Sequence, residues 1–275
     1  MLLWSTLGVV RRYINFPSEF ICLVRGAMAV LVLAGVLLAM GRKFDWAGVR
    51  QNLLPLVLGG MLLGTNWAFL FEAYQNTDVA IAELCYFTYP VFVTLLAPTV
   101  LREYIPFRQW VCCILALVGM VLVSGAYQQS IGEGDLLGVL LAVLAAAEVA
   151  GFIFCNKHIS GLGSYECAIV EMFMATLVLL PYTLLTDDWT AIAGADALSW
   201  GLTLMLGAVH TGFAYYIYFK GILGLRAQEI CILGFADPIM VIILGMVVLG
   251  EMLNGVQLVG AAIIVVSMMY AELRR

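Results

Sequence analysis

Acidic and aromatic side chains stand together inside a long apolar run of this sequence. In AELCYFTYPVF, Glu83 is followed by Tyr86, Phe87, Tyr89 and Pro90. The acid, the first two aromatic residues and the proline recur at i, i+3, i+4 and i+7, so they share one face of a helix. Aromatic rings attract ammonium groups, and a carboxylate beside them suits an organic cation. The plainer alternative is that these rings pack against neighbouring helices or face lipid.

Other ionisable residues lie within apolar runs, where inserting a charged side chain into a bilayer costs about 2.5–3.5 kcal/mol. They are Glu72, Glu148, Glu171, His210 and Asp237. No lysine or arginine is expected at the depth of the mid-span acids, the nearest being Arg25, for which we expect a structural salt bridge. Acids at that depth need a proton or a cation. His210 fits either a hydrogen-bonded core residue or a proton carrier.

Prolines and further aromatic residues complete the predicted site. Pro90 and Pro238 lie inside expected helices, where proline removes one backbone donor and frees the carbonyl four residues earlier. Each bend fits either a packing kink or an opening that lends a carbonyl to a cavity. The predicted substrate-binding residues are Trp4, Trp67, Glu72, Glu83, Tyr86, Tyr89, Glu148, His210, Tyr215 and Asp237. We expect no catalytic residues, metal ligands or cofactor.

The elements that position these residues are expected to be membrane helices. Hydrophobic residues make up 64% of the 275 residues and charged residues 11%, against about 45–50% and about 25% in soluble domains. Apolar runs of about 20 residues span a bilayer as helices, and continuous apolarity favours helices over strands. The expected spans are 1–14, 19–40, 53–76, 79–101, 107–126, 136–156, 165–186, 198–220, 228–250 and 255–272.

The basic residues are distributed unevenly among the predicted loops. Ten of the 13 lysines and arginines fall in or beside loops on one side of the predicted bundle. Basic loops are cytoplasmic as a rule, so both termini are expected to be cytoplasmic. The sequence thus predicts a multi-pass protein of the inner (plasma) membrane of a prokaryote.

The two halves of the chain repeat at an offset of 148 residues. Pro90 corresponds to Pro238, Gly64 to Gly212, and Glu103 to Glu251. The offset contains five predicted helices, an odd number, so the halves enter the membrane in opposite directions. The fold predicted is an all-α membrane protein of ten helices in two inverted five-helix repeats, residues 1–126 and 136–275, with a truncated first helix. Such repeats build secondary transporters with alternating access, whose solute site lies near the midplane.

Two runs carry a resemblance to a known family: TNWAFLFEAYQNTDVAIAELCYFTYPVFVTLLAPTVLRE and YIYFKGILGLRAQEICILGFADPIMVIILGMVVLGE. They resemble the paired signature of EamA-type transporters of the drug/metabolite transporter superfamily, and LLWSTLGVV resembles the family's first helix. The resemblance implies ten helices in two inverted repeats with alternating access. LFEAYQNT and CYFTYP are most similar to the subgroup that includes bacterial choline importers, whereas FADP places Asp237 where many relatives have Glu or a neutral residue.

These observations predict a secondary transporter of a small polar metabolite, with a choline-like organic cation as the first candidate and protons as a candidate coupling ion. The alternative is an exporter of neutral amino acids or other small metabolites. An intramembrane enzyme is disfavoured, because the sequence has two histidines and no HExxH or GxSxG motif. A primary pump is excluded by the absence of GxxxxGK[ST], and no basic block suggests nucleic acid.

Overall fold

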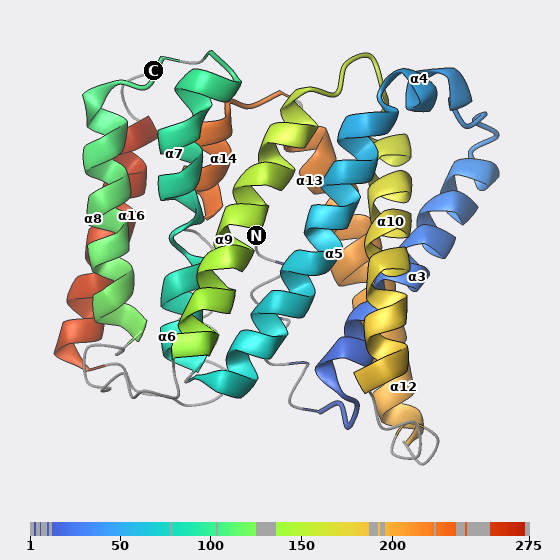
Figure 1. The fold of residues 1–275 in the computed structure, drawn as a ribbon, viewed down its shortest axis with the longest axis horizontal. Helices are drawn as coiled ribbons and strands as arrows, with labels where there is room; N and C mark the ends of the chain where they lie inside the picture. The colour runs from blue at the N-terminus through green and yellow to red at the C-terminus, as the bar shows by residue number, and fades with distance from the viewer. Residues whose placement is uncertain are drawn as a thin grey trace. The chain divides into compact units, whose positions relative to one another are not determined.

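The computed structural model describes residues 13–77, 79–102, 104–124, 136–186, 196–222, 224–234 and 254–272, together with five single positions, Leu3, Thr6, Val10, Ile192 and Met240. The regular structure of this part of the chain is helical (Figure 1). The residues group into two compact units that interleave along the sequence. Unit 1 contains Met1–Thr6, Phe69–Ala150 and Arg226–Arg275, and unit 2 contains Leu7–Ala68 and Gly151–Leu225.

Among the described residues, five helical stretches are long and apolar enough to cross a membrane. They are Ser18–Ala39, Leu53–Asn76, Leu136–Lys157, Ser164–Leu185 and Ala197–Ile222, and shorter apolar stretches occur at Leu84–Val100, Phe107–Leu122 and Gly255–Ser267. Leu31, Leu140 and Val266 are among many large apolar side chains left exposed, as suits helices in contact with lipid rather than water. The protein is therefore an all-helical, multi-pass membrane protein.

The described helices follow most of the predicted spans. In chain order they are α3 (Ser18–Ala39), α4 (Trp46–Gln51), α5 (Leu53–Asn76), α6 (Val79–Tyr86), α7 (Tyr89–Val100), α8 (Phe107–Ser124), α9 (Leu136–Lys157), α10 (Ser164–Thr186), α12 (Ala197–Met205), η3 (Leu206–Phe213), α13 (Ala214–Ile222), α14 (Ala227–Gly234) and α16 (Gly255–Glu272). The predicted spans 1–14 and 228–250 lie largely outside the described residues, so the count of ten and the inversion of the halves stay predictions.

The predicted helix 79–101 is interrupted, because α6 ends at Tyr86 and α7 begins at Tyr89. Pro90 occupies the first turn of α7, where its missing N–H is tolerated. The Thr88 hydroxyl donates to the carbonyl of Cys85 at 2.6 Å, and the Val91 amide donates to the carbonyl of Thr88 at 2.8 Å. Where a bend was expected at Pro90, the helix is therefore interrupted by a turn at Phe87 and Thr88.

In unit 2, α3 packs against both α10 and η3, and α3 and α10 lie next to each other in Figure 1. Glycines bring these helices close together, as small residues do in membrane bundles. Gly26 faces Thr176 of α10, and a Cβ placed on Gly207 of η3 would lie 3.3 Å from the Cα of Arg25. A further close approach joins α5 and α10, where a Cβ on Gly64 would lie 2.7 Å from the carbonyl oxygen of Ala175.

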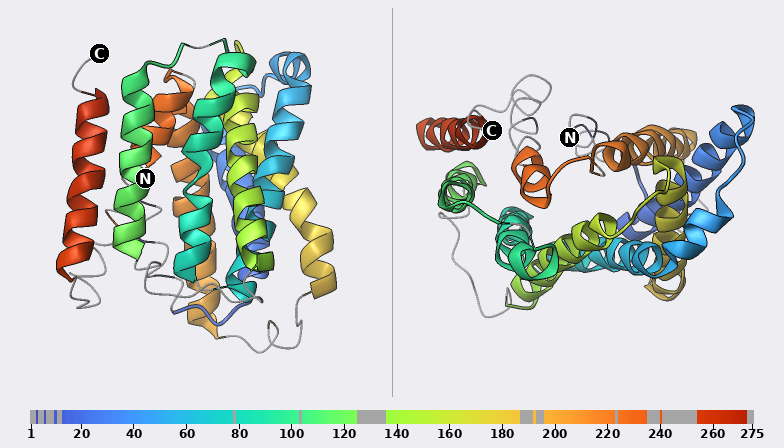
Figure 2. Two further views of the ribbon diagram at one scale, coloured as in Figure 1. Left: turned by 60° about the vertical axis from the view of Figure 1, so that its left-hand side comes forward. Right: turned by 90° about the horizontal axis from the view of Figure 1, so that it is seen from above.

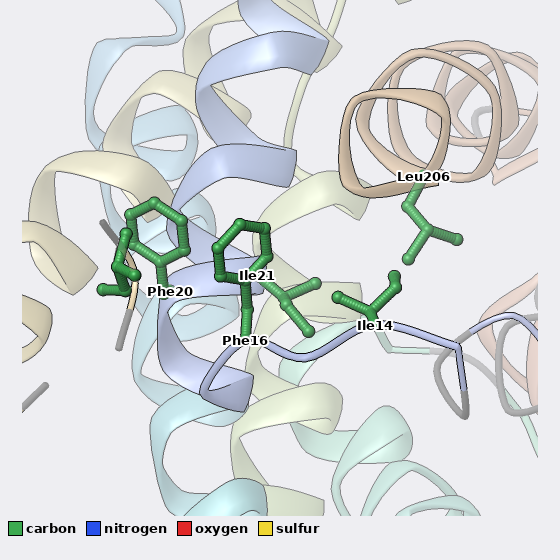
Figure 3. Packing of buried hydrophobic residues seen from close by; sticks show 6 residues of the cluster. Ile14, Phe16, Phe20, Ile21 and Leu206 are labelled. Carbon is green, nitrogen blue, oxygen red and sulfur yellow. The ribbon is translucent and has the colours of Figure 1, made fainter. Parts of the chain in front are cut away.

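A buried hydrophobic cluster fixes the beginning of α3 against the segment that holds η3. Its members come from the loop before α3, from α3 itself and from later parts of unit 2, and are Ile14, Phe16, Phe20, Ile21, Ile192 and Leu206. Ile14 and Leu206 lie next to each other in Figure 3. Trp200 of α12 adds edge-to-face contacts with Phe16 and Phe20, at centroid distances of 4.9 and 5.8 Å. This packing sets the position of η3 beside α3.

In unit 1, α8 and α16 lie side by side (Figure 2). Their contact is tight, because a Cβ on Gly119 would lie 2.7 Å from the carbonyl oxygen of Gly260. The same unit contains the pair α7 and α14, where Gly234 leaves space for the hydroxyl group of Tyr89. The broken helix α6–α7 is thereby held by α8 and α14 within this unit.

Candidate substrate-binding site

Arg25 is buried in α3, with 7% of its side chain exposed. Its Nε donates a hydrogen bond of 3.0 Å to Oγ1 of Thr211 in η3. Its Nη1 lies 3.9 Å from Sγ of Cys22, one turn earlier in the same helix. Its guanidinium carbon lies 5.4 Å from the centroid of the Trp67 ring, a cation–π contact. Three neutral groups from three helical segments therefore surround one positive charge.

The salt bridge expected for Arg25 is not found in the part of the chain that the structure describes, where none of these contacts is with a carboxylate. A guanidinium carries five N–H donors and no acceptor. One hydroxyl, one weak sulfur acceptor and one ring do not use all of them. A buried guanidinium in this setting is suited to bind an anionic group. Two of its N–H donors can bind the two oxygens of a carboxylate at once.

The partner hydroxyl of Arg25 belongs to an irregular turn. Residues Leu206–Phe213 form a π-helix within the long run from α12 to α13. Thr211 Oγ1 donates to the carbonyl oxygen of Leu206, five residues earlier, at 3.1 Å. Single π-turns inside α-helices are common at functional sites. The wide turn thus presents a buried hydroxyl group to Arg25.

Three residues predicted from the sequence lie around this arginine. Trp67 is 9% exposed, and its ring contacts that of Tyr215 edge-on at 6.3 Å. His210, on the π-helix, is 5% exposed. The charge of Arg25 acts electrostatically on both His210 and Tyr215. We name Arg25, Trp67, His210, Thr211 and Tyr215 the Arg25 cluster.

A second set of predicted residues lies in unit 1. The rings of Tyr86, Phe87 and Tyr89 contact one another at centroid distances of 6.0, 6.2 and 6.3 Å. The Glu72 carboxylate accepts a hydrogen bond of 3.2 Å from Asn76 in the last turn of α5. Glu148 is half-buried in α9. The backbone of Glu83 belongs to α6, but its side chain lies outside the described part of the structure, as do Trp4 and Asp237 altogether.

Glu171 of α10 was not among the predicted site residues, yet it is the most enclosed acid that the structure describes, with 0% exposure. Its Oε2 accepts a hydrogen bond of 3.2 Å from Nδ2 of Asn156, which is itself 1% exposed. The same Nδ2 donates to the carbonyl of Phe152 at 3.0 Å. The pair Gly59–Gly60 gives a sequence signal for this site, because adjacent small residues on α5 make room for a neighbouring side chain.

The family of the chain follows from its comparison with known proteins. A model described as "EamA-like transporter family" matches residues 1–125 and again residues 136–271. The chain belongs to the EamA-like transporter family. This family lies in the drug/metabolite transporter superfamily, and the resemblance stated from sequence motifs is confirmed.

Individual members of the EamA-like family align along most of the chain. "Uncharacterized transporter YxxF" of Bacillus subtilis (strain 168) is 28% identical over 100% of this chain and 88% of its own length. "Threonine/homoserine exporter RhtA" of Salmonella typhimurium (strain LT2) is 25% identical over 86% of this chain and 77% of its own length. One solved structure, "Crystal structure of protein", superposes with a TM-score of 0.87 at 19% identity, covering 100% of this chain and 95% of that one. That likeness concerns the fold alone.

The EamA-like family is a family of transporters, and membership in it supports a small-molecule transporter. Its substrate is then bound within the lipid bilayer, by groups buried among membrane helices. The Arg25 cluster is a candidate for this role, because it brings together a cation, an imidazole, two aromatic rings and a hydroxyl group. Among the residues that are described, no group of three or more His, Cys, Asp or Glu side chains is placed to hold a metal ion.

Proposed function

We propose that this chain is a secondary transporter that works by alternating access and that its solute carries a carboxylate group, as neutral amino acids do. The observation that supports this proposal most directly is the environment of Arg25, whose contacts in the described structure are all with neutral groups. A buried charge with no counter-ion is costly. A solute carboxylate would supply a negative charge that the described residues around Arg25 do not.

The same environment disfavours an organic cation at the Arg25 cluster. The face of Trp67 is already occupied by the guanidinium group of Arg25. A quaternary ammonium group would lose that ring and would meet a like charge in a poorly screened site. The alternative derived from the sequence, a transporter of neutral amino acids or other small metabolites, is therefore our first candidate.

A choline-like cation is the second candidate, and a separate observation favours it. Tyr86, Phe87 and Tyr89 form a mutually contacting aromatic group in unit 1. Such rings contribute about 0.5–2 kcal/mol each to the binding of an ammonium group. We propose that, for such a cation, this aromatic group receives the ammonium group.

Two results of the comparisons support the rest of the proposal. The relative RhtA is described as an exporter of threonine and homoserine, so an amino acid is a reasonable solute for this chain. The family model matches each half of the chain once, which supports two repeats at 1–126 and 136–275. We further propose that these repeats are inverted, that protons are the coupling ion, and that both termini face the cytoplasm of a prokaryotic cell.

The experiment that tests this proposal is flux through the purified protein in sealed proteoliposomes. The solutes are threonine, homoserine, a larger neutral amino acid and choline, each radiolabelled and measured in counterflow. We expect protein-dependent flux of at least one amino acid and a smaller flux of choline. Protein-free liposomes are the control for leakage. Flux of choline without flux of any amino acid would contradict our first candidate and support the second.

A further inference from the structure

Glu171 has an unusual combination of burial and incomplete hydrogen bonding. The side chain has 0% exposure, and only Oε2 is hydrogen-bonded, by Asn156. Oε1 has no hydrogen-bond partner among the described residues, and neither has Oδ1 of Asn156. Two buried acceptor oxygens on neighbouring side chains of unit 2 therefore lack a hydrogen-bond donor among the described residues.

The surroundings of Glu171 contain no basic group among the described residues. Cys155 and Asn156 face it from α9, Gly59 and Gly60 face it from α5, and Cys167 lies one turn before it in α10. The phenol of Tyr215 on α13 is within electrostatic range of the carboxyl group. All of these neighbours are neutral when the thiols and the phenol are protonated. A carboxylate would therefore be surrounded by groups that do not compensate its charge.

Glycine at position 59 is what admits the carboxyl group between α5 and α10. A Cβ placed on Gly59 would lie 2.6 Å from Oε1 of Glu171, closer than such atoms approach. A Cβ on Gly60 would lie 2.7 Å from the carbonyl oxygen of Glu171, so the two helices meet backbone to backbone. The free oxygen therefore points at a glycine surface, with no side chain to shield it if the two helices separate.

We propose that Glu171 is the proton-binding site of the transport cycle. In the conformation described, the carboxyl group is a neutral acid, because an ionised one would be buried with no cation. When α5 and α10 move apart, water reaches Oε1 and the O–H bond breaks, giving a carboxylate and a hydrated proton. Reburial requires a proton to be taken up again, so the conformational change and proton binding are linked. This inference rests on the proposed alternating-access transport.

The variant that tests this site is Glu171→Gln, which keeps the size and the hydrogen bond to Asn156 but cannot exchange a proton. Infrared spectroscopy of the purified protein gives a readout that does not depend on transport. We expect the wild type at pH 7 to show the C=O stretching band of a protonated carboxyl group that Glu171→Gln lacks. Asp45→Asn is the control, since this exposed residue caps α4 and asparagine caps a helix as well.

A second measurement, of transport, tests whether the proton on Glu171 takes part in the transport cycle. In proteoliposomes we expect Glu171→Gln to keep solute counterflow. The uphill accumulation of solute that a pH gradient drives should fall at least tenfold below that of the wild type. If the infrared band is unchanged in Glu171→Gln, or if this variant keeps gradient-driven accumulation, Glu171 is not the proton-binding site. If the wild type moves no solute at all, the proposed function fails instead, and that failure is visible without any variant.

Discussion

Arg25 and Thr211 are 186 positions apart in the sequence, yet Nε of the arginine lies 3.0 Å from the hydroxyl oxygen of the threonine. The contact exists because α3 packs against the π-helix η3, with Gly207 and Gly212 at the interface. The same hydroxyl group donates to the carbonyl of Leu206. Through Thr211, the orientation of the buried guanidinium is tied to the shape of the wide helical turn.

Replacing Thr211 by valine tests whether its hydroxyl group orients Arg25. Thr211→Val keeps the side-chain shape and removes the hydroxyl group, so Arg25 loses its nearest acceptor. A hydrogen bond to a charged group contributes about 1.5–3 kcal/mol, so we expect solute affinity to fall about tenfold, measured as the half-saturation of counterflow. Thr99→Val is the control, because Thr99 is exposed and its hydroxyl bonds only to the carbonyl of Leu96 in its own helix. An affinity equal to that of the control would show that Thr211 does not orient the arginine.

Gly64 is predicted to be required for the contact between α5 and α10. A methyl group at this position would lie 2.7 Å from the backbone oxygen of Ala175, which cannot rotate away. Such overpacking costs about 1–3 kcal/mol, so Gly64→Ala should lower the melting temperature of the detergent-solubilised protein. Gly35→Ala is the matched control, because Gly35 lies within α3 with nothing within 4 Å of its added Cβ. We expect the control to be neutral or stabilising, since alanine favours helices.

Asn52 joins the start of α5 to the loop between α9 and α10. Its side-chain Nδ2 donates to the carbonyl oxygen of Ser160 at 3.0 Å, and its Oδ1 accepts from the backbone N–H of Ser160 at 3.0 Å. Asn52 is 4% exposed. Asn52→Ala removes both of these hydrogen bonds, each of which contributes about 0.5–1.5 kcal/mol. We expect a clear drop in melting temperature. The exposed cap Asn254→Ala serves for comparison and should have the smaller effect.

Asp196 gives a prediction about pH. Its carboxylate accepts a hydrogen bond of 2.6 Å from the Ser199 hydroxyl, and this bond holds the pKa of Asp196 below its ordinary value. A lowered pKa in the folded state means that ionised Asp196 stabilises the protein above the ordinary value of about 4. That contribution is lost as the pH falls through the lowered value. Asp196→Asn should therefore flatten the fall of the melting temperature between pH 5 and pH 3; an unchanged slope would contradict this role.

Much of the helical framework follows from apolar runs alone. The expected span 53–76 is α5 to the residue, and the expected 136–156 and 165–186 differ from α9 and α10 by one residue. Long uninterrupted apolarity specifies such helices, because backbone groups in lipid must be satisfied within the segment. Pro90 likewise indicated where the helix 79–101 is broken. The π-helix at 206–213 was not predictable, because its wide turn depends on contacts with α3.

The candidate site was only partly predictable for a similar reason. Trp67, His210 and Tyr215 were recognisable as polar or aromatic residues in apolar runs, and they do surround one charge. The sequence placed Arg25 in a salt bridge, because a buried arginine suggests an acid. Glu171 and Asn156 are on different helices, and only the packing of α9, α10 and the Gly59 surface brings them together.

The most direct test of the carboxylate-binding role of Arg25 compares a neutral amino acid with its amide, which lacks the carboxylate group. Binding of the best-transported amino acid and of its amide is measured by calorimetry on the wild type, on Arg25→Lys and on the exposed control Arg50→Lys. We expect the wild type and the control to bind the acid at least tenfold more tightly than the amide. Arg25→Lys should lose most of that preference, because lysine lacks the planar fork. Equal binding of acid and amide by the wild type would contradict the account.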